Sequence, residues 1–307
     1  MSTVASQVSI RRQARCRPGD NTDDEGKHVK RFGARLRDAI ADRGPLCVGI
    51  DPHPALLAQW GLPDTVEGVA RFAETVIESV ADRVAAVKPQ SAFFERFGSQ
   101  GVAVLESTIR QLQVAGSIVI LDVKRGDIGS TAAAYAAAYL ADGAPLAADA
   151  ITASPYLGVG ALRPMIELAV QNGRGVFVLS RTSNPEGEVL QRARIGGGCT
   201  VAQHIIDEIS QLNAGVEPVG DVGVVFGATV PDDDIDLTYV NGPVLVPGLG
   251  AQGGRPEDLP KVLGSSSSVV LASYSREILR CGPTVAGLRT AADRATAGCG
   301  KVLKITK

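Results

Sequence analysis

The sequence predicts a (β/α)8 barrel in a single domain, and three observations lead to this prediction. Eight short apolar or β-branched runs alternate with longer segments of helical period. Polar and charged residues stand at or just after the carboxyl ends of several runs, where barrels of this type gather their functional groups. The chain has 307 residues, a length that one such domain commonly fills.

The expected strands follow one another at regular intervals. They cover residues 46–51, 85–90, 117–124, 149–155, 175–182, 222–229, 243–250 and 268–274. The segments that read as amphipathic helices are 66–83, 101–116, 130–144, 159–173 and 200–215, and 255–264 could supply a short helix. An open, doubly wound sheet would alternate in the same way, but it would concentrate its ligand groups near a switch point instead of at one barrel mouth.

The first 29 residues differ from the rest. They are polar, rich in Arg, Asp, Ser and Gly, and lack a convincing apolar period. We therefore expect residues 1–29 to be a flexible extension and residues 30–307 to form the barrel domain.

Composition excludes several classes of protein. A formal net charge of -2 gives no reason to expect a nucleic-acid or membrane surface. No apolar run reaches transmembrane length, and the N-terminus lacks the apolar core of a signal peptide. The five cysteines lie far apart without a CxxC pair, which favours reduced thiols over a disulfide framework or a zinc cluster. We expect a cytoplasmic protein.

A charged cluster follows the third expected strand. Asp122 and Lys124 are two residues apart, so on a strand they would project together into the barrel mouth, and Asp127 lies in the turn that follows. Two carboxylates flanking an ammonium would keep it charged and fix its position. The alternatives are a structural ion-pair network or, for Asp127, a helix N-cap.

Four segments together resemble the orotidine 5'-phosphate decarboxylase family. "DVKRGDIGST" fits its Asp-x-Lys-x-x-Asp signature, "LCVGIDPHP" its first-strand aspartate segment, "AAVKPQSAFFERFG" its second-strand lysine segment and "VPGLGAQGG" its glycine-rich phosphate segment. The resemblance extends from about residue 30 to the end of the chain, and the chain is similar to the longer bacterial branch of the family.

The resemblance implies a reaction and a partner. The family converts orotidine 5'-phosphate to uridine 5'-phosphate and carbon dioxide in pyrimidine biosynthesis, without a metal or an organic cofactor. Lys124 matches the proton donor, and Asp122 matches the carboxylate beside the departing group. Asp127 and Thr131 match residues that the family donates across a dimer interface, so we expect a homodimer with shared active sites.

The same resemblance implies the substrate-binding residues. Asp51 and Lys88 match the groups that hold the ribose hydroxyls, and Ser183 matches the serine that contacts the pyrimidine amide. The residues expected at the phosphate are Gln252, the amides of Gly250 and Gly253, and Arg276, and Pro247 of the same segment is expected to bind the substrate. Ser275-Arg276 replaces the usual Gly-Arg pair, so Arg280 remains an alternative to Arg276.

Other functions occur on barrels of the same type and have to be weighed against this one. A metal-dependent aldolase or decarboxylase acting on phosphosugars would need additional oxygen ligands for magnesium, and Lys88 places a cation where a ligand would be useful. A non-catalytic nucleotide-binding barrel could lose the charged cluster, which this chain keeps. Phosphate-binding barrels of tryptophan or histidine biosynthesis give no account of the Asp-Lys-Asp element. His53 reads as a turn residue rather than a base.

Overall fold

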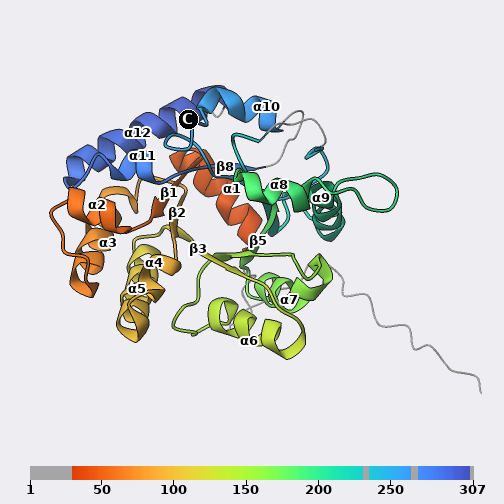
Figure 1. Ribbon diagram of the computed structural model, residues 1–307, viewed down its shortest axis with the longest axis horizontal. Coiled ribbons are helices and arrows are strands. Elements are labelled where there is room, and N and C mark those ends of the chain that lie inside the picture. The colour runs from red at the N-terminus through yellow and green to blue at the C-terminus, as the bar shows by residue number, and fades with distance from the viewer. Residues whose placement is uncertain (1–29, 231–234, 264–268, 305–307) are drawn as a thin grey trace, which may run out of the picture.

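Eight parallel strands close into a barrel in sequence order (Figure 1). The computed structural model describes residues 30–230, 235–263 and 269–304. The strands are β1 (Leu46–Ile50), β2 (Ala86–Pro89), β3 (Ile118–Arg125), β4 (Ala150–Ala153), β5 (Gly175–Arg181), β6 (Val222–Phe226), β7 (Val244–Val246) and β8 (Val270–Tyr274). Every expected strand is present, and β1 pairs with β8, which excludes the open sheet. The predicted extension at residues 1–29 lies outside the described residues, as do residues 264 and 268 at the edges of two predicted elements.

Helices surround the barrel. The longer ones are α1 (Phe32–Arg43), α3 (Val66–Val80), α5 (Gly98–Val114), α6 (Gly129–Leu140), α7 (Arg163–Gln171), α9 (Val201–Leu212) and α12 (Val285–Val302). Short helices follow several strands: α2 (Pro54–Gln59), α4 (Ala92–Glu95), α8 (Glu188–Gln191), α10 (Leu259–Leu263) and α11 (Arg276–Leu279), with single 3-10 turns at Val159–Leu162, Pro185–Gly187 and Pro256–Asp258. All the predicted helices are confirmed. Most have shorter ends, but α5 and α6 begin earlier than predicted, at Gly98 and Gly129. Helices α1 and α12 were not predicted.

Threonine side chains fix the start of three outer helices. Thr65, Thr200 and Thr284 each accept a hydrogen bond from the backbone N–H three residues later, at the N-termini of α3, α9 and α12. Such caps satisfy a donor that the first helical turn leaves free, so these residues set where each helix begins against the barrel wall.

The apolar interior divides into two clusters. One lies between the barrel wall and the outer helices, and the other fills the barrel itself and includes α1. Phe32 of α1 meets the ring of Phe177 edge to face, with centroids 5.9 Å apart. Gly175 permits this contact, because a Cβ at that position would lie 2.3 Å from the Phe32 ring. Helix α1 therefore closes the amino-terminal end of the barrel, opposite the mouth.

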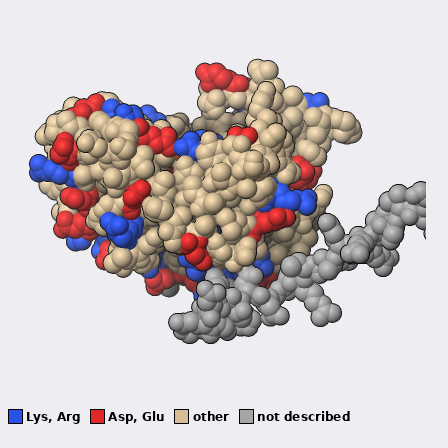
Figure 2. Space-filling view, turned by 90° about the horizontal axis from the view of Figure 1, so that it is seen from below, with Lys and Arg blue, Asp and Glu red and all other residues tan. Residues whose placement is uncertain are grey.

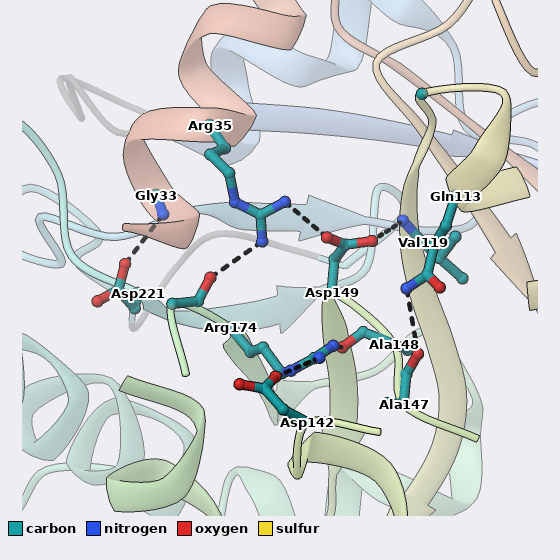
Figure 3. Close-up of polar contacts among 12 residues, drawn as sticks. Gly33, Arg35, Gln113, Val119, Asp142, Ala147, Ala148, Asp149, Arg174 and Asp221 are labelled. Atoms are coloured by element: carbon teal, nitrogen blue, oxygen red, sulfur yellow. Dashed lines mark hydrogen bonds and ion pairs between the residues drawn. The ribbon is translucent and has the colours of Figure 1, made fainter. Parts of the chain in front are cut away.

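Polar contacts fasten α1 to the strand ends (Figure 3). The Asp221 carboxylate accepts from the backbone N–H of Gly33 at 3.0 Å. Arg35 binds Asp149 at 2.6 Å, and the other oxygen of Asp149 accepts from the N–H of Val119 at 3.0 Å. Because these partners precede different strands, the contacts hold the closing helix in one orientation.

The surface carries charges of both signs. Figure 2 shows Lys and Arg interspersed with Asp and Glu on one face of the molecule. Within the described ranges, no helix combines the length and the apolar character needed to cross a membrane.

We expect Phe32→Ala to lower the free energy of unfolding by about 3 to 5 kcal/mol, because it empties a fully buried site between α1 and β5. Urea denaturation followed by circular dichroism would measure the change. The matched control is Val114→Ala at an exposed position, with an expected change within about 0.5 kcal/mol. Equal stability of the two variants would show that α1 does not close the core.

Candidate active site

Asp122 of β3 is the centre of a buried polar cluster at the barrel mouth. Its Oδ2 accepts from Lys88 Nζ and from Gln90 Nε2, both at 2.9 Å. Its Oδ1 accepts from Lys124 Nζ at 2.6 Å and from Thr152 Oγ1 at 2.7 Å. With only 6% of Asp122 exposed, these four donors replace water around both carboxylate oxygens.

Opposite charges keep this cluster ionised. Burial alone would raise the pKa of Asp122, but the ammonium groups of Lys88 and Lys124 outweigh it and hold that pKa well below its usual range. Burial would likewise lower the pKa of Lys88, but Asp122 and then Asp51 raise it above its usual value. A buried ion pair is therefore fixed beside the half-exposed ammonium of Lys124.

The flanking groups differ from the sequence expectation. Within one chain, a carboxylate stands between two ammonium groups, instead of the Lys124 ammonium between Asp122 and Asp127. In the part of the chain that the structure describes, Asp127 forms no ion pair with Lys124, and its Oδ1 accepts from the N–H of Ile128 at 2.8 Å. Nor does Asp127 cap a helix, since α6 begins at Gly129 after Ile128.

Lys124 stands at an irregularity of β3. Its φ is 45°, a left-handed conformation that is rare for a residue with a side chain, and the register with β4 shifts between Leu121 and Arg125. The N–H of Lys124 leaves the sheet pattern and donates to Thr152 Oγ1 at 2.9 Å. The expected meeting of Asp122 and Lys124 is present, and it occurs at this irregularity.

Asp51 lies at the carboxyl end of β1 and carries an unused acceptor. Its Oδ2 accepts from the hydroxyl of Ser275, whereas its Oδ1 is buried and has no hydrogen-bond partner among the described residues. A buried oxygen in that state is suited to accept from a ligand hydroxyl. The contact also explains Ser275, the residue at which this chain departs from the family's Gly-Arg pair.

The segment after β7 turns sharply at three glycines. Gly248, Gly250 and Gly253 have φ of 97°, 71° and 94°, which glycine adopts without strain. A Cβ at Gly248 would lie 3.2 Å from Gln252 Oε1 and 3.8 Å from Ser183 Oγ, so these two predicted binding residues lie around the same turn. Pro247 precedes it, and the carbonyl of Pro247 accepts from the N–H of Ala228 at 2.8 Å.

The amides of Gly250 and Gly253, which are expected to meet the phosphate, form hydrogen bonds within the turn. The N–H of Gly250 donates to the carbonyl of Gly254, and the N–H of Gly253 donates to the carbonyl of Gly250, both at 2.8 Å. Both donors are used to shape the turn. A phosphate that met either of these amides would have to replace one of these bonds.

Two arginines lie near the end of β8. Arg276 is half-buried at the first position of α11, and the exposed Arg280 follows that helix. Neither guanidinium forms a hydrogen bond or ion pair within the described residues, and Arg276 is the closer in sequence to the strand end. Burial lowers the pKa of the neighbouring His53, and both arginine charges add to that effect against the charge of Asp51. His53 precedes α2 in a turn, as the sequence predicts.

Sequence reasoning missed Gln90, Thr152 and Ser275. A signal for Gln90 was present, because it lies two residues after Lys88 and so faces the same way. Thr152 is the only polar residue in "AITA" of β4, and a lone hydroxyl in a fully buried strand calls for a partner. Across the described part of the chain, no group of three or more His, Cys, Asp or Glu side chains is arranged to hold a metal ion.

Comparisons with known proteins point to one family. Residues 44–289 match the orotidine 5'-phosphate decarboxylase / HUMPS family. Orotidine 5'-phosphate decarboxylase of Salinispora arenicola is 66% identical over 275 residues, which cover 90% of this chain and 99% of the relative. The enzyme of that name from Streptomyces coelicolor is 57% identical over 263 residues, covering 86% and 95%.

A solved structure extends the comparison to the fold. The crystal structure described as an orotidine 5'-phosphate decarboxylase from Streptomyces avermitilis superimposes with a TM-score of 0.87 at 54% identity, covering 90% of this chain and 97% of that one. Both the barrel and the segments that carry the charged cluster fall within the matched region, and the chain belongs to the orotidine 5'-phosphate decarboxylase / HUMPS family.

Proposed function

We propose that this chain decarboxylates orotidine 5'-phosphate to uridine 5'-phosphate in pyrimidine biosynthesis. The observation that carries the proposal is the Lys88–Asp122–Lys124 arrangement, in which a fixed, ionised carboxylate holds an ammonium at the barrel mouth. The curated relatives named above bear that activity in their names, at up to 66% identity. The proposed enzyme occupies one domain, residues 30–307.

The chemistry follows from the charges. When the bond between C6 and the carboxylate carbon breaks, carbon dioxide leaves and the electron pair remains at C6. The ammonium of Lys124 stabilises that developing charge and then donates a proton to C6, and its half-exposed position allows solvent to return the proton. Asp122 orients the Lys124 ammonium, and its four hydrogen bonds keep Asp122 itself in place.

The other predicted residues are proposed to bind the rest of the substrate. Asp51 and Lys88 would hold the ribose hydroxyls, which the free Oδ1 of Asp51 supports. Ser183 would contact the pyrimidine amide. Gln252, Pro247 and Arg276 would surround the phosphate, with Arg276 preferred to Arg280 because it directly follows the end of β8. Binding energy at the phosphate can then organise the loops around C6.

A metal-dependent phosphosugar enzyme is the main alternative. A magnesium ion in this mouth would need carboxylate oxygens, but both oxygens of Asp122 already accept two hydrogen bonds each, one of them from an ammonium. A metal would have to displace Lys88 or Lys124. The occupied oxygens of Asp122 therefore favour a reaction that uses no metal at this carboxylate, and we propose that no organic cofactor takes part either.

A single assay tests the reaction. Purified protein should change the ultraviolet absorbance of orotidine 5'-phosphate as uridine 5'-phosphate forms, at the same rate with and without excess EDTA. If EDTA abolished the reaction and Mg²⁺ restored it, the metal-dependent alternative would be favoured. Absence of conversion by folded protein would instead favour a nucleotide-binding barrel.

We further propose a homodimer with shared sites. Helix α6 is apolar but exposes a run of alanines: Ala133, Ala134, Ala137 and Ala138. Ile128 and Tyr156, which follow β3 and β4, are 61% and 77% exposed. Contiguous exposed apolar surface is typical of an interface. Asp127 and Thr131 border this surface, and in the described chain neither forms a hydrogen bond with its own Asp122 or Lys124.

We propose no nucleic-acid or membrane partner, which the net charge of -2 supports. We also propose a cytoplasmic location. Its support is that the four described cysteines, Cys47, Cys199, Cys281 and Cys299, are free thiols.

A further inference from the structure

Arg125, the last residue of β3, follows Lys124 directly and is held on three sides. Its Nη2 binds Glu95 Oε1 at 2.6 Å, and its Nε donates to the hydroxyl of Tyr139 at 3.3 Å. The guanidinium carbon lies 5.6 Å from the ring centre of Tyr135 and 5.9 Å from that of Tyr139. The guanidinium is thereby joined to α4 through Glu95 and to α6 through the two tyrosines.

Glu95 extends the contact back to the catalytic strand. The same oxygen that binds Arg125 also accepts from the hydroxyl of Ser91. The backbone N–H of Ser91 donates to the carbonyl of Asp122 at 3.3 Å. Both ends of the four-residue segment 122–125 are therefore attached to the same short helical region, and Lys124 lies between the two attachments.

Strand β4 holds the segment from the other side. The N–H of Ser154 donates to the carbonyl of Arg125 at 2.9 Å, beside the contact between Lys124 and Thr152. Gly126 allows this approach, since a Cβ there would lie 2.3 Å from the carbonyl oxygen of Ser154. The chain on each side of Lys124 is fixed by bonds that do not involve the Lys124 side chain.

This fixation accounts for the unusual backbone of Lys124. A left-handed conformation in a residue other than glycine persists only where its surroundings over-determine it. If the attachment at Arg125 were lost, β3 could relax toward ordinary strand geometry. Lys124 would then still share a face with Asp122, but its ammonium would be displaced from its present contact with that carboxylate. A displacement of about 1 Å at a reacting group can cost about 100-fold in rate.

We propose that Arg125 is a positioning residue, which through Glu95, Tyr135 and Tyr139 holds the Lys124 backbone in the conformation that the reaction needs. In this role Arg125 acts through Lys124 and not through a contact of its own with the substrate. The inference rests on the proposed decarboxylation, in which Lys124 is the proton donor. Arginine suits this place because a planar guanidinium can bind a carboxylate and lie against aromatic rings at the same time.

Steady-state kinetics and product binding test the proposal together. We expect Arg125→Ala to lower kcat by about 10- to 100-fold, as the loss of an orienting group does. Affinity for uridine 5'-phosphate, measured by calorimetry, should stay within about threefold, because only the transition-state interaction is lost. Added guanidinium ion should restore part of kcat. Arg125→Lys should lie between Arg125→Ala and wild type.

The matched control is Arg174→Ala at the other end of the barrel. Arg174 also binds a carboxylate and a backbone carbonyl, those of Asp142 and Ala148 (Figure 3). Its removal should leave kcat unchanged. The proposal is overturned if folded Arg125→Ala keeps the kcat of wild type, or if its kcat and product affinity fall in proportion to lost stability.

Two further measurements keep the proposal testable. If Arg125→Ala does not fold, Glu95→Gln and Tyr139→Phe each remove one contact and should lower kcat by smaller factors; unchanged kcat in both would refute the role. A crystal structure of Arg125→Ala or Glu95→Gln should show Lys124 outside the left-handed region. This structural result can be obtained whether or not the protein is active. An inactive wild-type protein would therefore refute the proposed function, but not the role of Arg125 in holding the Lys124 backbone.

Discussion

Lys124→Ala is expected to lower kcat/KM for orotidine 5'-phosphate by at least about 10⁴-fold, because one side chain supplies both the proton and the positive charge at C6. The variant should still fold, since Asp122 keeps its bonds to Lys88, Gln90 and Thr152. The absorbance assay measures the rate, and circular dichroism checks the fold.

Two further variants make the Lys124 experiment specific. Lys124→Arg keeps the charge but not a readily transferred proton, so its rate should lie close to that of Lys124→Ala if proton donation dominates. Lys30→Ala removes an exposed ammonium that pairs with Asp38 of α1, at the end of the barrel opposite the mouth. This variant should leave the rate unchanged. If Lys124→Ala stayed within about tenfold of wild type, another group would have to be the proton donor.

The sequence was a good guide to the barrel but not to α1 and α12, which lie before the first strand and after the last, outside the alternation that predicted the other helices. Strands were found because their β-branched runs are short and apolar. Helix α12 buries Leu288, Ala292 and Cys299, and α1 buries Gly33 and Ala34 beside its larger side chains. The small residues of α12 add little to an apolar period, whereas Phe32, Leu36 and Ile40 of α1 recur every four residues and did offer a helical signal. The role of α1 in closing the barrel depends on contacts with Asp149 and Asp221, more than 100 residues away.

In the site, alternation along one strand predicted which side chains of that strand share a face. It did not predict which side chains of neighbouring strands meet them. Asp122 and Lys124 were identified from β3 alone. Lys88, Gln90 and Thr152 come to the same carboxylate only because β2 and β4 are its neighbours. The left-handed backbone of Lys124 and the internal hydrogen bonds of the loop after β7 are products of tertiary packing, which no local pattern encodes.

The role of Asp127 cannot be predicted from the fold of one chain, because its proposed role requires a second chain. Dimers of Lys124→Ala and dimers of Asp127→Ala should each be nearly inactive, but a mixture that exchanges subunits should recover activity. In a heterodimer, one site combines both defects and the other combines neither, since the intact Lys124 and the intact Asp127 come from different chains. Equal mixing makes half of the dimers mixed, each with one working site, so roughly a quarter of wild-type activity should return.

The control uses two residues that act within one chain. Asp122 and Lys124 are in contact at 2.6 Å, so mixing Asp122→Ala with Lys124→Ala leaves a defect in every site and should restore nothing. Native mass spectrometry would establish the exchange in both mixtures. If exchange is complete and the Asp127→Ala mixture also stays inactive, Asp127 does not act in the partner's site, and the exposed surface around α6 would need another explanation. Recovery in that mixture alone would assign Asp127 to the partner's site, because no arrangement within one chain can restore activity by exchange.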